Sequence, residues 1–484
     1  MPAVRAYPKL LVLIVAEQFR TDYLDRVRGS LTAGGFRHLM EAGAWYPDCR
    51  FAGSTFTSSG AATLATGAWP QQHGIVADVW YDRTSGKPVP ASAESMLATT
   101  LASQVAAAPR TRVFVSAMDP LPGALLEGRT PAAGFFTQPR GQFLARGETP
   151  AWVEEFNRLH PIENLHNARW AAIGAAADVP PLRVLTQDGA QPEQFNALYR
   201  SSPFAQIRQF EFVRELIAHE GLGRGETTDF LAVSLGPLAQ LAYEVGADSP
   251  LIDQMVLHLD RQLEFTIESL NKEPGPGNYV LVFTAAHGAP PAPEPSNRSR
   301  MAVNGEALAR AIDLALSERF DTVPTRTAWV EKYVYPFLWL RAGAMRARNP
   351  REVRAAAAQA ALANPAVAGY FTADGDSSHG GEWARRFRNS FHATRSGDVM
   401  LSYQPGYVEE YGAGRGISYG SLYNYDACVP LFLYGPQFRP RVFENTIEPI
   451  DIAPTLARLA GVALPSSSTG RVLAEVFAEP AGRK

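Results

Sequence analysis

Cysteine is scarce in this sequence, which holds Cys49 and Cys428 and no others among its 484 residues. Two cysteines cannot build a disulfide framework or an all-thiolate zinc site. Charge is also sparse: 19% of the residues are charged, and 45 basic against 48 acidic side chains leave a net charge of −3. That balance gives no general surface for polyanions, so we expect no nucleic-acid partner.

Long apolar runs are missing as well. The run from Leu10 to Ala16 is far shorter than the roughly 18 residues that a membrane-spanning helix needs, so we expect no membrane span. Arg5 and Lys9 give it the basic flank of a signal peptide, but no small-residue cleavage site follows. We therefore identify no clear signal peptide, interpret the run as a buried strand, and leave the compartment open.

Apolar material is plentiful overall, since 46% of residues are hydrophobic and 10% aromatic. This excludes a disordered or fibrous chain. Short runs rich in β-branched and aromatic residues predict strands at 9–16, 112–116, 230–234, 279–284, 398–403 and 430–434. Helical patterns lie between them at 94–107, 204–219, 251–271, 305–319, 351–363 and 451–459. The alternation predicts an α/β fold: a doubly wound, mostly parallel sheet with helices on both faces.

Two segments break this alternation with glycine, proline and aromatic residues. They lie at about 121–182 and about 325–370, and we interpret both as cap insertions above the sheet. The prediction is one α/β domain over 1–484 that carries these two insertions. The sequence does not predict an oligomeric state.

A hydroxyl-rich stretch, residues 55–60, precedes a helix-like stretch at 61–66. A hydroxyl at the start of a helix lies near free backbone N–H groups and the positive end of the helix dipole, where a phosphate can bind. The same position also suits a simple N-cap. Thr57 is therefore either a phosphate-facing residue or a helix cap.

Segments spread along the chain resemble the alkaline phosphatase superfamily, specifically its threonine-nucleophile phosphomonoesterases and nucleotide pyrophosphatase/phosphodiesterases. They occur in the family's order at 12–24, 55–82, 230–246, 284–288, 395–407, 420–435 and 451–465, and include His73-Gly74-Ile75. The resemblance implies a doubly wound sheet whose strand ends hold two zinc ions around a phosphoryl group, beside a cap. Family members are usually exported to the periplasm.

Some family positions are kept or conservatively changed. Thr57 falls on the nucleophile, and Glu17 falls on the metal-binding aspartate after the first strand. The family pattern Thr-Ala-Asp-His-Gly reads here as Thr284-Ala285-Ala286-His287-Gly288, so the histidine remains and Ala286 replaces the aspartate.

Other family positions are lost. The Asp-x-x-x-His pair of the second metal falls on Ala239 and Tyr243, and its last histidine falls on Cys428. The phosphate-contacting asparagine falls on Asp78, and the Lys-x-Arg clamp falls on Met118-Asp119-Pro120.

Zinc needs three or four nitrogen, sulfur or oxygen ligands, and only Glu17, His287 and Cys428 remain at the metal positions. We predict a degenerate di-zinc site, no cofactor at full occupancy, and a protein that is inactive or strongly impaired as a phosphatase. Asp78 would also repel phosphoryl oxygens. The expected role is binding or regulation, with a small-molecule or phosphate-ester-like ligand.

Two alternatives stay open. The chain could be a zinc-dependent phosphomonoesterase or phosphodiesterase with Thr57 as nucleophile and a rebuilt centre on Glu17 and His287, completed by Cys428 or Asp78. The pocket that holds the phosphoryl group in the family could instead bind an uncharged or cationic molecule here. Its lining would be more apolar, because it would contain Ala239, Ala286, Met118 and Tyr243.

Three of these residues also have plain structural interpretations. His287 could bond nearby backbone groups, and Cys428 could be a small buried apolar residue. Glu17 would need a partner at a buried strand end, and His287 could supply it as an ion pair.

Overall fold

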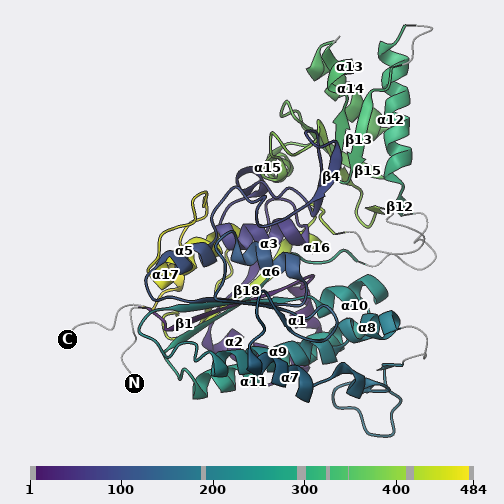
Figure 1. The fold of residues 1–484 in the computed structure, drawn as a ribbon. Helices are drawn as coiled ribbons and strands as arrows, with labels where there is room; N and C mark the ends of the chain where they lie inside the picture. The colour runs from purple at the N-terminus through teal and green to yellow at the C-terminus, as the bar shows by residue number, and fades with distance from the viewer. Residues whose placement is uncertain are drawn as a thin grey trace.

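The computed structural model describes residues 7–186, 192–291, 301–322, 327–346, 348–409 and 419–478. A nine-stranded sheet forms the larger part of the molecule, and helices cover both of its faces (Figure 1). A smaller four-stranded sheet with its own helices lies to one side, beyond the face that carries α3 (Figure 1). The predicted fold class is confirmed.

The middle of the large sheet is parallel. Its central strand is β1 (Leu10–Ala16), with β10 (Asp229–Leu235) on one side and β11 (Tyr279–Ala285) on the other. Next to β10 come β5 (Val113–Ala117) and β6 (Gly134–Thr137), also parallel. Every residue of β1, β10 and β11 is buried, because helices cover both faces of the sheet and shield the side chains on either face from solvent.

The two edges of this sheet are mixed. On one side, β18 (Cys428–Tyr434) runs antiparallel to β11 and to β2 (Ala44–Arg50), and β19 (Arg441–Val442) closes the edge. On the other side, β7 (Leu144–Ala145) runs antiparallel to β6. The predicted strand at 430–434 is therefore real but antiparallel.

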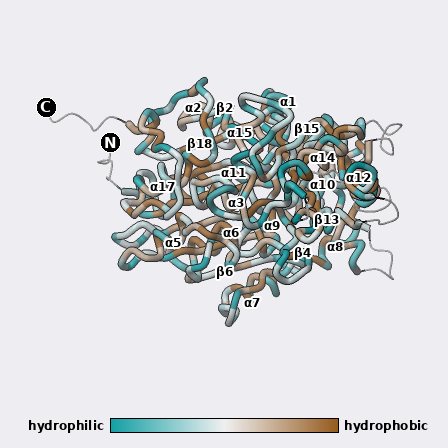
Figure 2. Tube along the Cα trace, turned by 90° about the horizontal axis from the view of Figure 1, so that it is seen from above, coloured by the Kyte–Doolittle hydropathy of each residue, from teal (hydrophilic) through white to brown (hydrophobic). Residues whose placement is uncertain are grey.

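Two helical layers enclose the sheet (Figure 1). One contains α3 (Thr57–Thr66), α5 (Leu101–Ala107), α6 (Pro120–Glu127) and α17 (Ile452–Ala460). The other contains α1 (Asp22–Val27), α2 (Phe36–Ala42), α7 (Ala151–Leu159), α8 (Pro192–Arg200), α9 (Pro203–His219), α10 (Pro237–Val245) and α11 (Pro250–Lys272). Buried hydrophobic residues of the strands and helices form one core between these layers. Figure 2 shows the hydrophobic stretches of these elements in brown.

The smaller sheet corrects part of the sequence interpretation. It is antiparallel, in the order β13 (Val330–Val334), β14 (Phe337–Leu340), β16 (Val399–Tyr403), β15 (Val367–Thr372). The helices α12 (Gly305–Phe320) and α14 (Pro350–Leu362) pack on it around a separate core. The strand at 398–403 was expected in the large sheet and the helix at 305–319 on one of its faces, whereas the helix at 351–363 lies within the insertion predicted at about 325–370. Periodicity reveals an element, but it does not say which sheet the element joins.

The segment 121–182 also differs from expectation. It supplies β6 and β7 to the edge of the large sheet, and it places α7 against α9, where the rings of Trp152 and Phe212 stack with centroids 5.2 Å apart. Its aromatic residues thus pack into the main core instead of lying above the sheet.

The remaining elements are short. They are α4 (Pro70–His73), α13 (Ala342–Arg346), α15 (Gly381–Ser390), α16 (Asn424–Ala427), β3 (Val79–Asp82), β4 (Lys87–Pro90), β8 (Arg169–Trp170), β9 (Arg183–Val184), β12 (Ala302–Val303), β17 (Val408–Glu409) and 3-10 turns at 28–30, 162–165, 449–451 and 474–476. Across the described part of the chain, none of the helices has the length and apolar character needed to cross a bilayer.

Candidate functional site

The carboxyl ends of the central parallel strands meet the beginning of α3. Glu17 follows β1, and Ala286 and His287 follow β11. Backbone hydrogen bonds continue past the strands, from Glu17 N–H to Leu235 O (3.0 Å) and from Ala286 N–H to Ala16 O (2.9 Å). Residues far apart in sequence are therefore held at one edge of the sheet, where open α/β sheets place their ligands.

A glycine lets α3 approach this edge. A Cβ atom at Gly60 would overlap the carbonyl oxygen of Ala286, so any larger residue would force the helix away from the end of β11. Gly288 is constrained in the same way, because a Cβ there would overlap the carbonyl oxygen of Tyr425. The first contact sets how closely the first turn of α3 approaches the residues after β11, and the second sets how closely α16 approaches them.

Thr57 and His287 are joined by a hydrogen bond. Thr57 Oγ1 lies 2.9 Å from His287 Nε2, and His287 Nδ1 lies 2.7 Å from the carbonyl oxygen of Gly288. Because a carbonyl can only accept, Nδ1 carries the ring proton and Nε2 accepts from the Thr57 hydroxyl. Burial lowers the pKa of His287 to about 4, which keeps the ring neutral.

This geometry tests the plain structural interpretations of Thr57 and His287. Phe56 holds the N-cap position of α3, and Thr57 is the first helical residue, with its side chain turned to His287. The helix-cap interpretation is therefore wrong. The expectation that His287 bonds a neighbouring backbone group is confirmed for Nδ1.

Asp78 and Tyr419 complete the cluster. Asp78 Oδ1 accepts the backbone N–H of Ser58 at 2.8 Å, and Asp78 Oδ2 accepts the Tyr419 hydroxyl at 2.8 Å. The Tyr419 ring stacks on His287, with centroids 4.6 Å apart and planes 18° apart. We call Thr57, Asp78, His287 and Tyr419 the α3 network. A carboxylate of the protein itself thus binds a backbone donor in the first turn of α3.

Glu17 lies beside this network but outside its hydrogen bonds. It is 7% exposed, and within the described residues its carboxyl group has no hydrogen bond or ion pair. Burial raises its pKa to about 8, and the negative charges of Asp119 and Asp78 add to the effect. Glu17 is therefore mainly protonated at neutral pH.

The predicted ion pair between Glu17 and His287 does not form. Both ring nitrogens of His287 already have partners, in Thr57 and Gly288. Both groups also lose their charge through burial, the carboxyl group by holding its proton and the imidazole by losing one.

The segment Met118-Asp119-Pro120, which falls on the family's Lys-x-Arg clamp, brings the acidic side chain of Asp119 to the site instead of basic ones. Asp119 accepts two hydrogen bonds from Nη2 of Arg200, at 2.7 and 2.9 Å, and Arg200 also donates to Pro139 O at 3.1 Å. Met118 is buried, and Pro120 begins α6. The Arg200 charge partly opposes the rise in the Glu17 pKa. Arg200 lies in α8, about 80 residues along the chain, so no local pattern points to it.

The second predicted metal position is apolar and aromatic. Ala239 and Tyr243 lie one turn apart on α10, so they share a face of the helix. The centroid of the Tyr243 ring lies 5.8 Å from that of the Tyr419 ring. Burial raises the pKa of the Tyr243 hydroxyl above its usual value. Gln18, whose φ is +59°, is fully buried nearby, and its amide group has no hydrogen-bond partner within the described residues. Neither Ala239 nor Tyr243 is an ordinary zinc ligand.

Cys428 faces a different set of neighbours. Its Sγ lies 3.4 Å from Asp48 Oδ1 and 3.9 Å from Thr21 Oγ1. Burial and the Asp48 charge raise the thiol pKa to about 11, so the thiolate that a metal would need is disfavoured. The thiol is half-buried, not fully buried as expected.

The donors at this edge do not fit a zinc ion. The nitrogens of His287 and the oxygens of Asp78 are bonded within the protein, Glu17 holds its proton, and Cys428 is turned to Asp48. Among the residues that the structure describes, no three His, Cys, Asp or Glu side chains are grouped to hold a metal.

Sequence reasoning missed Tyr419 and Arg200. Tyr419 directly precedes the segment 420–435 that resembles the family, but a tyrosine beside a glycine has no motif that marks it as a site residue. Its position against His287 depends on tertiary packing, which a local sequence pattern does not contain.

Comparisons with known proteins agree with this architecture. Residues 11–420 match the model of the family described as type I phosphodiesterase/nucleotide pyrophosphatase. Alkaline phosphatase PafA of Elizabethkingia meningoseptica is 25% identical over 522 residues, covering 97% of this chain and 94% of PafA. Alkaline phosphatase PhoV of Synechococcus elongatus is 26% identical over 543 residues, covering 98% of this chain and 94% of PhoV.

Solved structures show the same fold. The crystal structure of wild-type PafA superposes with a TM-score of 0.83 at 23% identity, covering 98% of this chain and 99% of PafA. Murine ectonucleotide pyrophosphatase/phosphodiesterase 5 gives a TM-score of 0.56 at 15% identity, covering 94% of this chain and 95% of that protein. The strand and helix arrangement described above is shared with both.

Proposed function

The chain belongs to the type I phosphodiesterase/nucleotide pyrophosphatase family of the alkaline phosphatase superfamily, and from that premise we propose that it is a catalytically inactive or strongly impaired member. In this proposal the di-zinc centre is degenerate, and the protein serves as a binding or regulatory module. Support comes from protein groups that bond one another at the strand ends, where the resemblance to the family implies the phosphate-ester site.

The bond from Ser58 N–H to Asp78 carries the proposal. A phosphoryl group at the first turn of α3 would need this donor, which already binds a carboxylate at 2.8 Å. The anion would also meet the Asp78 charge, and the Tyr419 ring covers His287. Without metal ions, the leaving oxygen lacks a Lewis acid, and the loss is many orders of magnitude in rate.

One observation favours the second candidate, a hydrolase with Thr57 as nucleophile. The Thr57 hydroxyl donates to a neutral imidazole, as an attacking hydroxyl does beside a general base. The alternative still needs a rebuilt metal centre, for which the donors would have to leave their present partners. We therefore rank it second.

The test combines metal analysis with activity. Purified protein, loaded with excess zinc and then desalted, should retain less than one ion per chain and should not hydrolyse aryl phosphate mono- or diesters above background. Two retained zinc ions per chain, or turnover that Thr57→Ala abolishes, would establish the hydrolase instead.

A paired variant tests the role of Asp78 directly. Asp78→Asn combined with Tyr419→Phe removes the charge and the hydroxyl that occupy the helix start, so this protein should bind inorganic phosphate more tightly than the parent. Tyr81→Phe is the matched control: it also removes a phenol hydroxyl, but that hydroxyl donates to Glu331 in β13 of the smaller sheet and not to the α3 network. Equal phosphate affinity in parent and double variant would contradict the proposed blocking role.

A further inference from the structure

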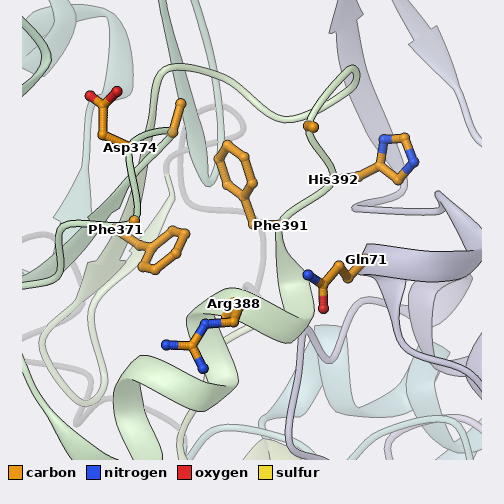
Figure 3. A pocket seen from close by; sticks show the side chains of 9 residues that line it. Gln71, Phe371, Asp374, Arg388, Phe391 and His392 are labelled. Atoms are coloured by element: carbon orange, nitrogen blue, oxygen red, sulfur yellow. The ribbon is translucent and has the colours of Figure 1, made fainter. Parts of the chain in front are cut away.

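A separate pocket lies where the two sheets and their helices meet. It is open to solvent and has a volume of about 500 Å³, within the range of small-molecule sites. Gln71 comes from α4, Phe371 and Asp374 from the end of β15 and the turn after it, Arg388 from α15, and Phe391 and His392 from the segment after α15 (Figure 3). We call it the α15 pocket. None of the α3 network lines it.

Arg388 gives the pocket an uncompensated positive charge. Within the described residues, its guanidinium group has no hydrogen bond or ion pair. Asp374 does not neutralise it, because both Asp374 oxygens accept hydrogen bonds from Arg354, at 2.7 and 2.6 Å. Figure 3 shows the Asp374 carboxylate turned away from Phe391 and Arg388. The pocket therefore favours an anion.

His392 adds a neutral donor to the wall. Its Nδ1 lies 3.2 Å from Thr394 Oγ1 and 3.4 Å from Thr394 N–H, which can only donate, so Nδ1 accepts and the ring proton lies on Nε2. Burial, with the Arg395 charge, lowers the pKa of His392 and keeps the ring neutral. Gln71 contributes an exposed amide. Donors thus outnumber acceptors among the free polar groups of the lining.

Two phenyl rings form the apolar part of the wall. Phe371 and Phe391 lie edge to face, with ring centroids 5.6 Å apart, and Figure 3 places Phe371 above the Arg388 guanidinium group. Such rings take a planar apolar body, while a guanidinium fork pairs with a carboxylate through two parallel hydrogen bonds. One ligand that satisfies both is a ring with a carboxylate attached.

We propose that the α15 pocket binds a small aromatic carboxylate, with the carboxylate on Arg388 and the ring against Phe371 and Phe391. The ligand would join α4 of the larger part to α15 and β15 of the smaller part. The proposal does not depend on the state of the α3 network, because no residue is shared.

Calorimetric titration of the full chain with benzoate tests the proposal. Benzoate should bind with a dissociation constant in the millimolar range or below, and benzamide and acetate should each bind at least about tenfold more weakly, since each lacks one of the two groups. Arg388→Gln should weaken benzoate about tenfold or more, and Arg388→Lys should weaken it less. Arg261→Gln, on an exposed face of α11, is the matched control and should leave affinity unchanged.

A second variant, which fills the pocket with a large side chain, tests the proposal without changing Arg388, in case Arg388 is needed for folding. Ala373→Trp should abolish benzoate binding while circular dichroism and the unfolding midpoint stay near the parent values. The proposal is wrong if benzoate fails to bind at millimolar concentration, if Arg388→Gln binds it as well as the parent, or if inorganic phosphate competes as strongly as benzoate does.

Discussion

The α3 network and the α15 pocket both contain polar side chains, but those of the network bond one another, whereas the positively charged group of the pocket has no bond within the described residues. In the network, the Thr57 hydroxyl bonds the His287 imidazole, and the Asp78 carboxylate accepts the Tyr419 phenol; Thr57 and His287 are buried, and Asp78 and Tyr419 are half-buried. In the pocket, the Arg388 guanidinium group has no protein partner among the described residues, and a cavity of about 500 Å³ lies beside it. Polar groups that satisfy one another stabilise the fold, whereas polar groups left free can recognise a ligand.

The largest effect should come from Gly60→Ala. Its methyl group would overlap the Ala286 carbonyl oxygen, so α3 must move and the Thr57–His287 bond must stretch. We expect a loss of about 3 kcal/mol or more in unfolding free energy, measured by urea denaturation. Gly343→Ala, where a Cβ meets nothing within 4 Å, is the control and should be neutral or slightly stabilising. Equal stability of both variants would mean that α3 does not pack tightly on β11.

Glu17→Gln should change the pH dependence of stability. The folded-state pKa is raised to about 8 from the ordinary 4.5. The unfolded chain therefore releases this proton first, and stability falls as the pH rises from about 5 to about 8. The glutamine variant lacks this contribution, so its stability should rise by about 3–4 kcal/mol relative to the parent between those pH values. Parallel stability curves for the two proteins would contradict a protonated Glu17.

Asp78→Ala tests how much the network contributes. It leaves the Ser58 N–H and the Tyr419 hydroxyl without their acceptor, and we expect a cost of about 2 kcal/mol by chemical denaturation. Asp78→Asn keeps one acceptor oxygen and should cost less. If alanine costs no more than asparagine, these hydrogen bonds do not stabilise the fold.

The smallest effect should come from Arg388→Gln without ligand. Because Arg388 is exposed and makes no ion pair within the described residues, its replacement should change the unfolding free energy by less than about 0.5 kcal/mol. A larger loss in thermal or urea unfolding would place Arg388 among the structural residues and weaken its contrast with the α3 network.

The sequence predicted the elements better than their partners. The run at 10–16 is the central strand as expected, since a continuous apolar run suits a strand buried on both faces. The strand at 398–403 was correct as a strand but belongs to the smaller sheet, and 121–182 joins the larger one. Pairing depends on contacts between distant segments, which a local pattern does not contain.

The same holds for the candidate site: the sequence predicted residues that lie there, but not which of them bond one another. Resemblance gathered Thr57, Asp78, Glu17 and His287 at one edge of the sheet, and the structure holds them close together. It gave no indication of Tyr419 or Arg200. The Glu17–His287 ion pair, suggested by the need of a buried carboxylate for a partner, is absent. Partner choice depends on side-chain direction and burial, and these follow from packing.

By itself, the sequence determined the α/β architecture and the residue types at each strand end, because apolar periodicity and side-chain chemistry are local properties. Only the tertiary structure decided which donor meets which acceptor and which carboxyl group keeps its proton. Those outcomes depend on distance and on the exclusion of water, and both exist only once the chain has folded.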